Sequence, residues 1–284
     1  MPYAPINGAE LWYEEFGSGD KIVITASGGD FKFPDMNRWP WYLAEEGYHL
    51  YTITNRGHWK SSKEEVDLGI RWYDTWANDV YVFATEFLGV DRFIYTGLSH
   101  GSGIGWHLAD AHPECLKAFV AIVCGPHSRL GPETSPARQQ TIDLGDLLYE
   151  HPEKREELLN APDPDFSDLP PAQAEAARMH HNFRKIMIRD MSPQEMRINP
   201  RKPFPTIKTE AELIEKLKTI KVPTLMIGGV QDAIIGPDDM FRSAVAVPAV
   251  KLIMYQDGSH SVADEYREEV REDITTWLRR TVKD

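Results

Sequence analysis

Cysteine is scarce in this sequence, and its scarcity excludes two kinds of chemistry. The 284 residues include only Cys115 and Cys124. Neither has a second cysteine at the spacing of a C-x-x-C pair, so neither a thiolate metal site nor a dithiol redox motif is predicted. We interpret both as reduced thiols, which is typical of a cytoplasmic protein.

Long apolar runs are also absent. The sequence contains no stretch of about 18 apolar residues that could span a bilayer. The first residues, MPYAP, lack the charged-then-apolar pattern of a secretory signal. We therefore expect a cytoplasmic protein that has no membrane partner.

Positive charge is in deficit. Lysine and arginine number 31 against 44 aspartate and glutamate residues, which gives a formal net charge of -13. This balance argues against nucleic acids and anionic membrane surfaces as partners. The charge is spread along the chain, so it says little about the substrate. We expect a small-molecule substrate, and a homodimer stays open.

Apolar and amphipathic segments alternate along much of the chain, whose 42% hydrophobic content is enough for one large domain. The alternation predicts an α/β fold with a mostly parallel central sheet and helices on both faces. Strands are expected at 11–16, 21–26, 49–54, 92–96, 116–123, 224–227 and 251–255. Helices are expected at 35–46, 73–88, 102–112 and 263–280.

The middle of the chain has a different texture. From residue 125 to about residue 206 no clear strand is found, proline and charge are frequent, and helical pieces are separated by breakers such as PDP and PP. We interpret residues 126–206 as a helical cap inserted into an α/β core. That core would consist of residues 1–125 and 207–284.

A G-x-S-x-G pentapeptide, GLSHG at residues 97–101, is the most informative pattern in the chain. It lies between a predicted strand and a predicted helix, so Ser99 is expected at a sharp turn that exposes its hydroxyl. The flanking glycines let strand and helix approach each other without Cβ clashes. The helix N-terminus adds N–H groups where negative charge develops when a carbonyl is attacked. Ser99 is therefore our candidate nucleophile.

A serine nucleophile needs a base and a residue that orients the base. Parallel sheets gather functional groups at the carboxyl ends of their strands. His260 follows the predicted strand at 251–255, and Asp232 follows the one at 224–227 in a loop bounded by glycines. We predict that His260 is the base and Asp232 the acid.

Three other aspartates compete with Asp232. Asp257 is too close to His260 along the chain to orient its ring easily. Asp238 and Asp239 directly follow a proline, and they look like the acidic residues of a first helical turn.

The chain resembles the α/β-hydrolase fold superfamily in four blocks. They are GLSHG at 97–101, GVQD at 229–232, GSH at 258–260 and NRGHWKSS at 55–62. The last block is similar to the family's D-x-R-G-x-G-x-S loop, and the order Ser, Asp, His is that of its nucleophile-elbow enzymes. The resemblance covers nearly the whole chain and is least constrained in the cap.

The resemblance implies roles for five residues. Ser99, Asp232 and His260 would form the catalytic triad, and the backbone N–H groups of His100 and Gly29 would form the oxyanion hole. Some members place the acid after the strand that follows the elbow helix, but that stretch, CGPH at 124–127, has no carboxylate.

The chain also departs from the family pattern. SGG at 27–29 stands where His-Gly is usual, Trp59 replaces a glycine of the arginine loop, and Asn55 lies near the usual aspartate. We expect these changes to reshape the floor or rim of the pocket without removing a catalytic group.

We predict no metal and no cofactor. A zinc site needs several converging ligands, whereas the adjacent His180 and His181 would point in different directions on a helix, and His58 stands apart from them. The aromatic cluster of Trp39, Trp41 and Tyr42 is interpreted as a packed rim rather than a stacking platform.

Together these features predict a serine hydrolase that cleaves an ester or lactone of a small, moderately hydrophobic molecule through an acyl-enzyme on Ser99. Amide, thioester and C–C bond cleavage use the same machinery and stay open. A serine nucleophile argues against the haloalkane dehalogenase and epoxide hydrolase branches. Flexible apolar side chains of the cap would suit such a substrate or pack the cap against the core: Met179, Phe183, Met187, Met191 and Met196.

Two other functions remain as alternatives. One is a cofactor-independent dioxygenase on the same fold, whose elbow can also have the sequence Ser-His-Gly, as at Ser99 and His100. In that enzyme the His–Asp pair deprotonates an aromatic hydroxy-ketone. The other is a small-molecule receptor that keeps the triad but turns over slowly.

Overall fold

The computed structural model describes residues 2–27, 39–129, 136–192, 194–195, 198, 200 and 202–283. Its centre is an eight-stranded sheet with the order β1-β2-β4-β3-β5-β6-β7-β8. The first two strands pair antiparallel to their neighbours, and all the later pairings are parallel. The strands are β1 Tyr3–Ile6, β2 Ala9–Phe16, β3 Ile22–Ser27, β4 His49–Thr54, β5 Phe93–Leu98, β6 Leu116–Ile122, β7 Thr224–Gly229 and β8 Val250–Tyr255.

Burial explains which strands the sequence predicted. The central strands are buried on both faces, so each consists of a nearly continuous apolar run. Strand β1 alternates exposed and buried residues over only four positions, and it was missing from the predicted strands. A four-residue alternation is too short to distinguish an edge strand from a loop by its periodicity.

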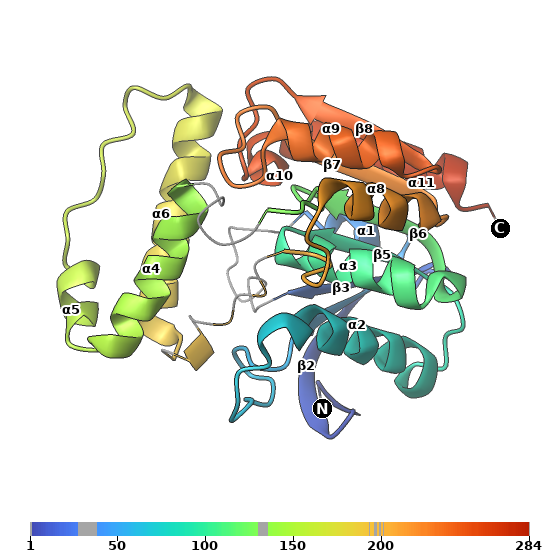
Figure 1. Cartoon of the computed structure of the whole chain (residues 1–284), viewed down its shortest axis with the longest axis horizontal. Coiled ribbons are helices and arrows are strands. Elements are labelled where there is room, and N and C mark those ends of the chain that lie inside the picture. Colours follow the sequence, from blue (N-terminus) through green and yellow to red (C-terminus); the bar gives the residue numbers. More distant parts are fainter. Residues whose placement is uncertain are drawn as a thin grey trace.

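Helices cover both faces of the sheet (Figure 1). The apolar side chains of α2, α3, α8 and α9 belong to one core cluster, and those of α1, α10 and α11 belong to another on the opposite face. These elements and the short turns between them are α1 Tyr42–Glu45, η2 Gly69–Arg71, α2 Trp72–Val82, η3 Phe83–Phe87, α3 His100–Ala111, η4 Pro113–Cys115, α8 Glu210–Thr219, α9 Pro237–Ala246, α10 Val262–Glu265 and α11 Arg267–Thr281.

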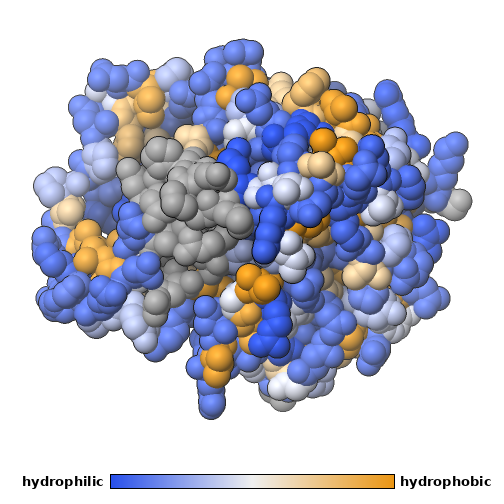
Figure 2. All heavy atoms as spheres, viewed as in Figure 1, coloured by the Kyte–Doolittle hydropathy of each residue, from blue (hydrophilic) through white to orange (hydrophobic). Residues whose placement is uncertain are grey.

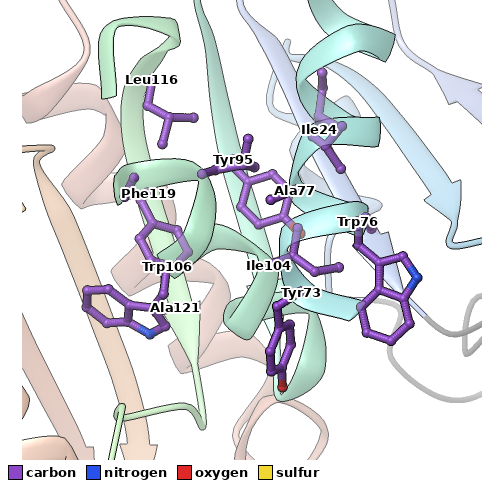
Figure 3. Close-up of a cluster of buried hydrophobic side chains, with 14 of the residues drawn as sticks. Ile24, Tyr73, Trp76, Ala77, Tyr95, Ile104, Trp106, Leu116, Phe119 and Ala121 are labelled. Atoms are coloured by element: carbon purple, nitrogen blue, oxygen red, sulfur yellow. The ribbon is translucent and has the colours of Figure 1, made fainter. Parts of the chain in front are cut away.

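The first core cluster joins the sheet to the helix that follows Ser99. Phe119 of β6 points toward Trp106 of α3 (Figure 3), and both side chains are fully buried, as is Tyr95 of β5. The ring centroids of Trp106 and Phe119 are 5.1 Å apart in an edge-to-face arrangement, a geometry that adds to the area they bury. This packing fixes α3 on the sheet.

Three further helices lie between the two halves of the core sequence: α4 Pro136–Glu150, α5 Lys154–Leu159 and α6 Pro171–Asp190. They stand beside the sheet rather than on either face (Figure 1). Leu144, Leu148 and Ile188 form a small cluster of their own between α4 and α6. Hydrophilic residues dominate the face of the molecule in Figure 2. We propose that residues 126–206 form a cap, with the boundaries given above.

Several helices differ from their predicted extents. The segment predicted as a helix at 35–46 contains only α1 within the described residues, after Pro40. The segment at 73–88 is α2 followed by a π-helical turn, η3. The terminal segment is divided at Tyr266 into α10 and α11. Helix α8, which begins with a Thr209–Glu212 capping box, was not among the predicted helices.

Candidate active site

Ser99 lies at the turn between β5 and α3, with φ 50° and ψ -114°. A non-glycine residue with positive φ is strained by about 1–3 kcal/mol and persists only where its surroundings hold it. Here its N–H donates to the carbonyl of Ile122 at 2.9 Å, and its own carbonyl accepts from the N–H of Gly103 at 3.1 Å. The strand and the helix therefore both hold the turn.

The two glycines of the pentapeptide are required by close backbone approach. A Cβ on Gly97 would lie 2.3 Å from the carbonyl carbon of Gly101, and a Cβ on Gly101 would lie 2.7 Å from the carbonyl oxygen of Ala26. Both distances are far below van der Waals contact. The pattern G-x-S-x-G thus has a steric cause in this structure, as the sequence suggested.

His260 lies in the loop between β8 and α10, and its ring reaches Ser99. The distance from His260 Nε2 to Ser99 Oγ is 3.0 Å, and the distance from His260 Nδ1 to Asp232 Oδ2 is 2.8 Å. In the tautomer with hydrogen on Nδ1, the ring donates to the carboxylate and accepts the serine proton at Nε2. The three predicted residues are therefore hydrogen-bonded in series.

Asp232 follows β7, and its side chain is only 1% exposed. Its second oxygen, Oδ1, accepts the N–H groups of Ile234 at 2.8 Å and Ile235 at 2.9 Å. These backbone donors stabilise the charged carboxylate and fix its orientation. One oxygen is thereby held by the loop while the other faces the imidazole.

The competing aspartates have other surroundings. Asp238 and Asp239 are in the first turn of α9, as expected. Asp239 is fully buried and is bonded to Arg129 and Arg242. Asp257 is exposed, and its backbone carbonyl accepts from Gln173 of α6 at 2.6 Å.

The loops that carry Asp232 and His260 are joined by their backbones. The N–H of Gln231 donates to the carbonyl of Gly258 at 2.8 Å. A Cβ on Gly229 would lie 2.1 Å from that same carbonyl oxygen, so a glycine is needed there. Because β7 and β8 are parallel neighbours, their carboxyl ends bring the two loops together.

The structure describes only one of the two predicted oxyanion donors, and the donor role of each stays a prediction. His100 is the first residue of α3, where backbone N–H groups point out of the helix end. Its ring Nδ1 lies 2.7 Å from the hydroxyl oxygen of Tyr73. Gly29 lies outside the described residues, so its role stays a prediction.

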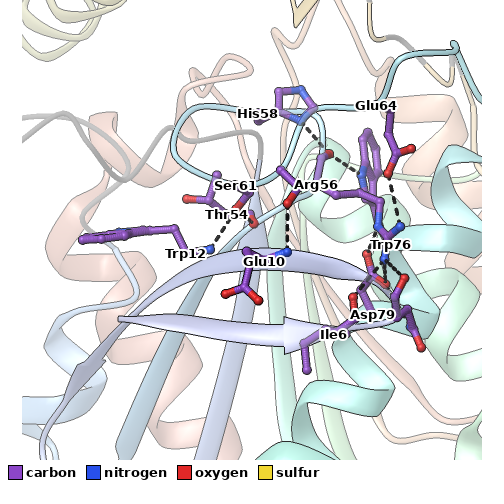
Figure 4. Close-up of polar contacts among 12 residues, drawn as sticks. Ile6, Glu10, Trp12, Thr54, Arg56, His58, Ser61, Glu64, Trp76 and Asp79 are labelled. Atoms are coloured by element: carbon purple, nitrogen blue, oxygen red, sulfur yellow. Dashed lines mark hydrogen bonds and ion pairs between the residues drawn. The ribbon is translucent and has the colours of Figure 1, made fainter. Parts of the chain in front are cut away.

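The arginine loop, residues 55–62, is attached to α2 by an ion pair between Arg56 and Asp79 (Figure 4). Arg56 is buried, and its Nε and Nη2 donate to the two carboxylate oxygens of Asp79 at 2.6 and 2.7 Å. Burial raises the pKa of Asp79, against the effect of the guanidinium. Bonds to Asp79 raise the pKa of Arg56 although its burial opposes this. The pair ties the loop to α2 and to the backbone carbonyl of Ile6.

Trp59 has φ 39° at the position where the family has glycine. Its N–H donates to Glu195 Oε1 at 2.5 Å, and Lys63 Nζ donates to the same oxygen at 2.6 Å. The Trp59 ring packs edge-to-face on Trp12. The contact between the arginine loop and the segment after α6 is thus made by the backbone of Trp59 and by Lys63, whereas the indole ring that replaces glycine contacts Trp12. Its effect on a pocket stays a prediction.

The aromatic cluster and the two cysteines pack in or against the interior of the protein. Trp39 and Tyr42 are buried in the second core cluster, and Trp41 packs against it. Both cysteines are buried, and neither forms a disulfide. Within the described residues, no group of three or more His, Cys, Asp or Glu could hold a metal ion.

In the proposed cap, Met179 and Met191 are half-buried. The side chains of His180, Phe183, Met187 and Met196 lie outside the described set. No helix in the part of the chain that the structure describes combines the length and apolar content needed to cross a membrane.

Two side chains near the candidate triad were not predicted from the sequence. Tyr73 of α2 contacts His100, and Glu265 of α10 bonds to Ser259 beside His260. Nothing in the sequence links Tyr73 to a residue 27 positions later. Glu265 had a local signal, because an acidic residue in a first helical turn can reach back to the preceding loop.

Comparison with known proteins establishes the family. The sequence profile of the α/β hydrolase fold matches residues 35–265, so the chain belongs to this family. A bifunctional esterase/perhydrolase of Acinetobacter calcoaceticus is 22% identical over 288 residues, which cover 96% of this chain and 97% of that protein.

Solved structures agree on the fold. The enol-lactonase of Burkholderia xenovorans LB400 has a TM-score of 0.69 at 21% identity, over 98% of this chain and 99% of that one. A bromoperoxidase of Bacillus anthracis has a TM-score of 0.70 at 20% identity, over 95% and 96%. At such identities the likeness concerns the fold and leaves the reaction to be argued from the site.

Proposed function

We propose that this α/β hydrolase cleaves an ester or a lactone of a small, moderately hydrophobic molecule, with Ser99 as nucleophile. The observation that carries the proposal is the chain of two hydrogen bonds from Ser99 Oγ through His260 to Asp232, at 3.0 and 2.8 Å. A hydroxyl in contact with a neutral imidazole, whose other nitrogen is held by a buried carboxylate, is an activated nucleophile.

The reaction has two halves. In the first, Ser99 Oγ attacks the carbonyl carbon while His260 Nε2 takes its proton. His260 then gives that proton to the leaving alkoxide oxygen as the C–O bond breaks. In the second half, His260 takes a proton from water, whose oxygen attacks the acyl carbon. His260 then returns that proton to Ser99 Oγ as the bond between the acyl carbon and Oγ breaks, which releases the acid and restores Ser99. Asp232 orients the ring and stabilises the imidazolium in both halves.

The tetrahedral oxyanion would be bound at the N-terminus of α3. We propose that the backbone N–H groups of His100 and Gly29 donate to it, where removal of one such donor costs about 3 kcal/mol of barrier. The N-terminal end of the helix dipole favours the same negative charge.

Ester or lactone bonds are proposed because of two relatives' names. The full-length curated relative is named an esterase/perhydrolase, and one similar structure is named an enol-lactonase. Both activities fit an acyl-enzyme mechanism. Those activities belong to those proteins, and the low identities leave the substrate of this chain to experiment.

The decisive experiment uses a series of p-nitrophenyl esters with graded acyl chains. We expect turnover by the wild-type protein and a single covalent adduct on Ser99 after treatment with a serine-directed phosphonate, detected by mass spectrometry. Ser99→Ala should give neither. Full activity in Ser99→Ala would refute the mechanism.

The same samples distinguish the two alternatives. Oxygen uptake with an aromatic hydroxy-ketone, unchanged in Ser99→Ala, would indicate a cofactor-independent dioxygenase. Binding of a small molecule that promotes association with a partner protein, without appreciable product, would indicate a receptor.

A further inference from the structure

One carboxylate secures the loop on both sides of His260. Glu265, the last residue of α10, accepts the N–H of Ser259 on Oε2 at 2.7 Å and the hydroxyl of Ser259 on Oε1 at 2.5 Å. The Ser259 hydroxyl oxygen in turn accepts the N–H of Ser261 at 3.1 Å. The residues before and after His260 are thus connected to the same side chain.

The rest of this loop is fixed at its start and its end. The carbonyl of Gly258 is bonded to the loop of Asp232, and the carbonyl of Ser259 accepts the N–H of Val262 at 3.2 Å. Between these points lies the residue whose ring must meet two partners at once. Two hydrogen bonds to the same side chain add geometric specificity as well as energy, and Glu265 accepts two from Ser259.

We propose that Glu265 is a positioning residue for His260, an inference that rests on the proposed function. Its two bonds to Ser259 hold the backbone of residues 259–261 so that the His260 ring reaches Ser99 and Asp232 together. Proton transfer falls steeply when the base is displaced, and a shift of about 1 Å can cost about 100-fold in rate. The hydrogen bonds of Glu265 go to Ser259 rather than to Ser99 or Asp232.

Two properties separate this role from simple stabilisation of the fold. Glu265 is only half-buried, in contrast to the fully buried Val262 of the same helix. Its bonds close a loop of a few residues and join no distant elements. Their loss should therefore loosen residues 259–261 while the sheet and its helices stay folded.

The test compares Glu265→Ala and Glu265→Gln with Glu268→Ala, which removes the same charge from an exposed position on α11. With p-nitrophenyl esters we expect Glu265→Ala to lower kcat by about 10- to 100-fold and KM to change less than about twofold. The glutamine can accept the Ser259 N–H on its amide oxygen and donate to the hydroxyl, so most of kcat should return. Glu268→Ala should match the wild type.

The rate of phosphonate labelling of Ser99 and the thermal midpoint are measured on the same samples. Slower labelling with an unchanged midpoint supports positioning. Wild-type kcat in Glu265→Ala overturns it, and so does a glutamine variant as slow as the alanine variant, because the carboxylate would then act by charge. A wild-type protein whose Ser99 is not labelled contradicts the proposed function instead. Ser259→Ala loses one of the two bonds to Glu265. Its kcat should therefore lie between that of Glu265→Ala and that of the wild type.

Discussion

The sheet and the cap bury their side chains on very different scales. On the first face of the sheet alone, Trp72, Trp106 and Phe119 are fully buried in one extended cluster. Among the described side chains of the proposed cap, the buried apolar cluster consists of Leu144, Leu148 and Ile188, with Leu158 and Leu159 packed against it. Hydrophobic stabilisation grows with the apolar area removed from water, so the two regions should differ strongly in stability.

Polar contacts connect the two regions. Gln173 of α6 donates to the backbone of Asp257 in the His260 loop. Glu195 accepts from Lys63 and Trp59 of the core, and Arg129 is paired with Asp239. The comparison suggests that the core folds by burying apolar surface, whereas the cap is held to it by a few directional bonds and by Phe204, which is buried in the first core cluster.

The largest expected effect separates chemistry from stability. Ser99→Ala should lower kcat by about 10⁶-fold, the loss seen when a triad nucleophile is removed as part of a unit, and leave the thermal midpoint within a few degrees. Hydrolysis of p-nitrophenyl esters and circular dichroism melts measure both. A variant that retains more than a tenth of wild-type kcat would contradict the assignment.

Breaking the ion pair between Arg56 and Asp79 tests how much it contributes to the stability of the core. Asp79→Ala leaves a buried guanidinium without its carboxylate, which costs about 3–5 kcal/mol of unfolding free energy. Urea denaturation measures it. Glu64→Ala removes the more exposed partner of the same arginine and should cost at most about 1 kcal/mol. Equal effects of the two variants would show that burial of the pair does not matter.

The boundary between core and cap should be sensitive to acid. Burial lowers the pKa of His58 to about 4, from an ordinary value of 6.5, although Glu195 opposes the shift and Lys63 adds to it. As the pH falls, His58 therefore takes up a proton in the unfolded state before it does so in the folded state. Stability should be unaffected above about pH 6.5 and decrease between about pH 6.5 and 4, by about 3 kcal/mol in total.

The check is unfolding free energy from urea titrations at pH 7, 6, 5 and 4. His58→Gln cannot titrate and should show a shallower decline over the same range. Parallel curves for the two proteins would mean that other groups cause the acid sensitivity.

The smallest effect is expected in the cap. Leu148→Ala should cost about 2 kcal/mol, the low end for a buried leucine, because a small cluster can collapse around the cavity. Hydrogen exchange should speed up in α4 and α6 but not in α3. Faster exchange throughout the sheet would show that cap and core unfold as one unit, which would contradict the comparison.

Sequence patterns were most informative where a local rule and a tertiary requirement coincide. The GLSHG turn could be predicted from its local pattern, and the structure shows why the pattern exists, since a Cβ on either glycine would lie within 3 Å of backbone atoms. The buried parallel strands could be predicted because they are continuously apolar. Strand β1 and helix α8 were missed. The first is short and half-exposed, and the second has a capping box that was not identified.

The candidate site could be predicted in part for the same reason. Asp232 and His260 follow strands, and the rule that strand ends meet at one edge of a parallel sheet made them candidates. The competing aspartates were set aside because Asp257 is too close to His260 along the chain, and because Asp238 and Asp239 look like acids of a first helical turn. Glu265 and Tyr73 were not selected, because their relation to the site depends on how a loop and a helix pack.

The sequence by itself determined the alternation of strands and helices, the strained serine turn and the order of the three candidate catalytic residues. These depend on interactions within a few residues or on burial along one strand. Only the tertiary structure decided that His260 lies 3.0 Å from Ser99 and 2.8 Å from Asp232, and that a glutamate of α10 secures its loop. Such distances depend on segments up to 161 positions apart, whose approach is decided by the packing of the whole sheet.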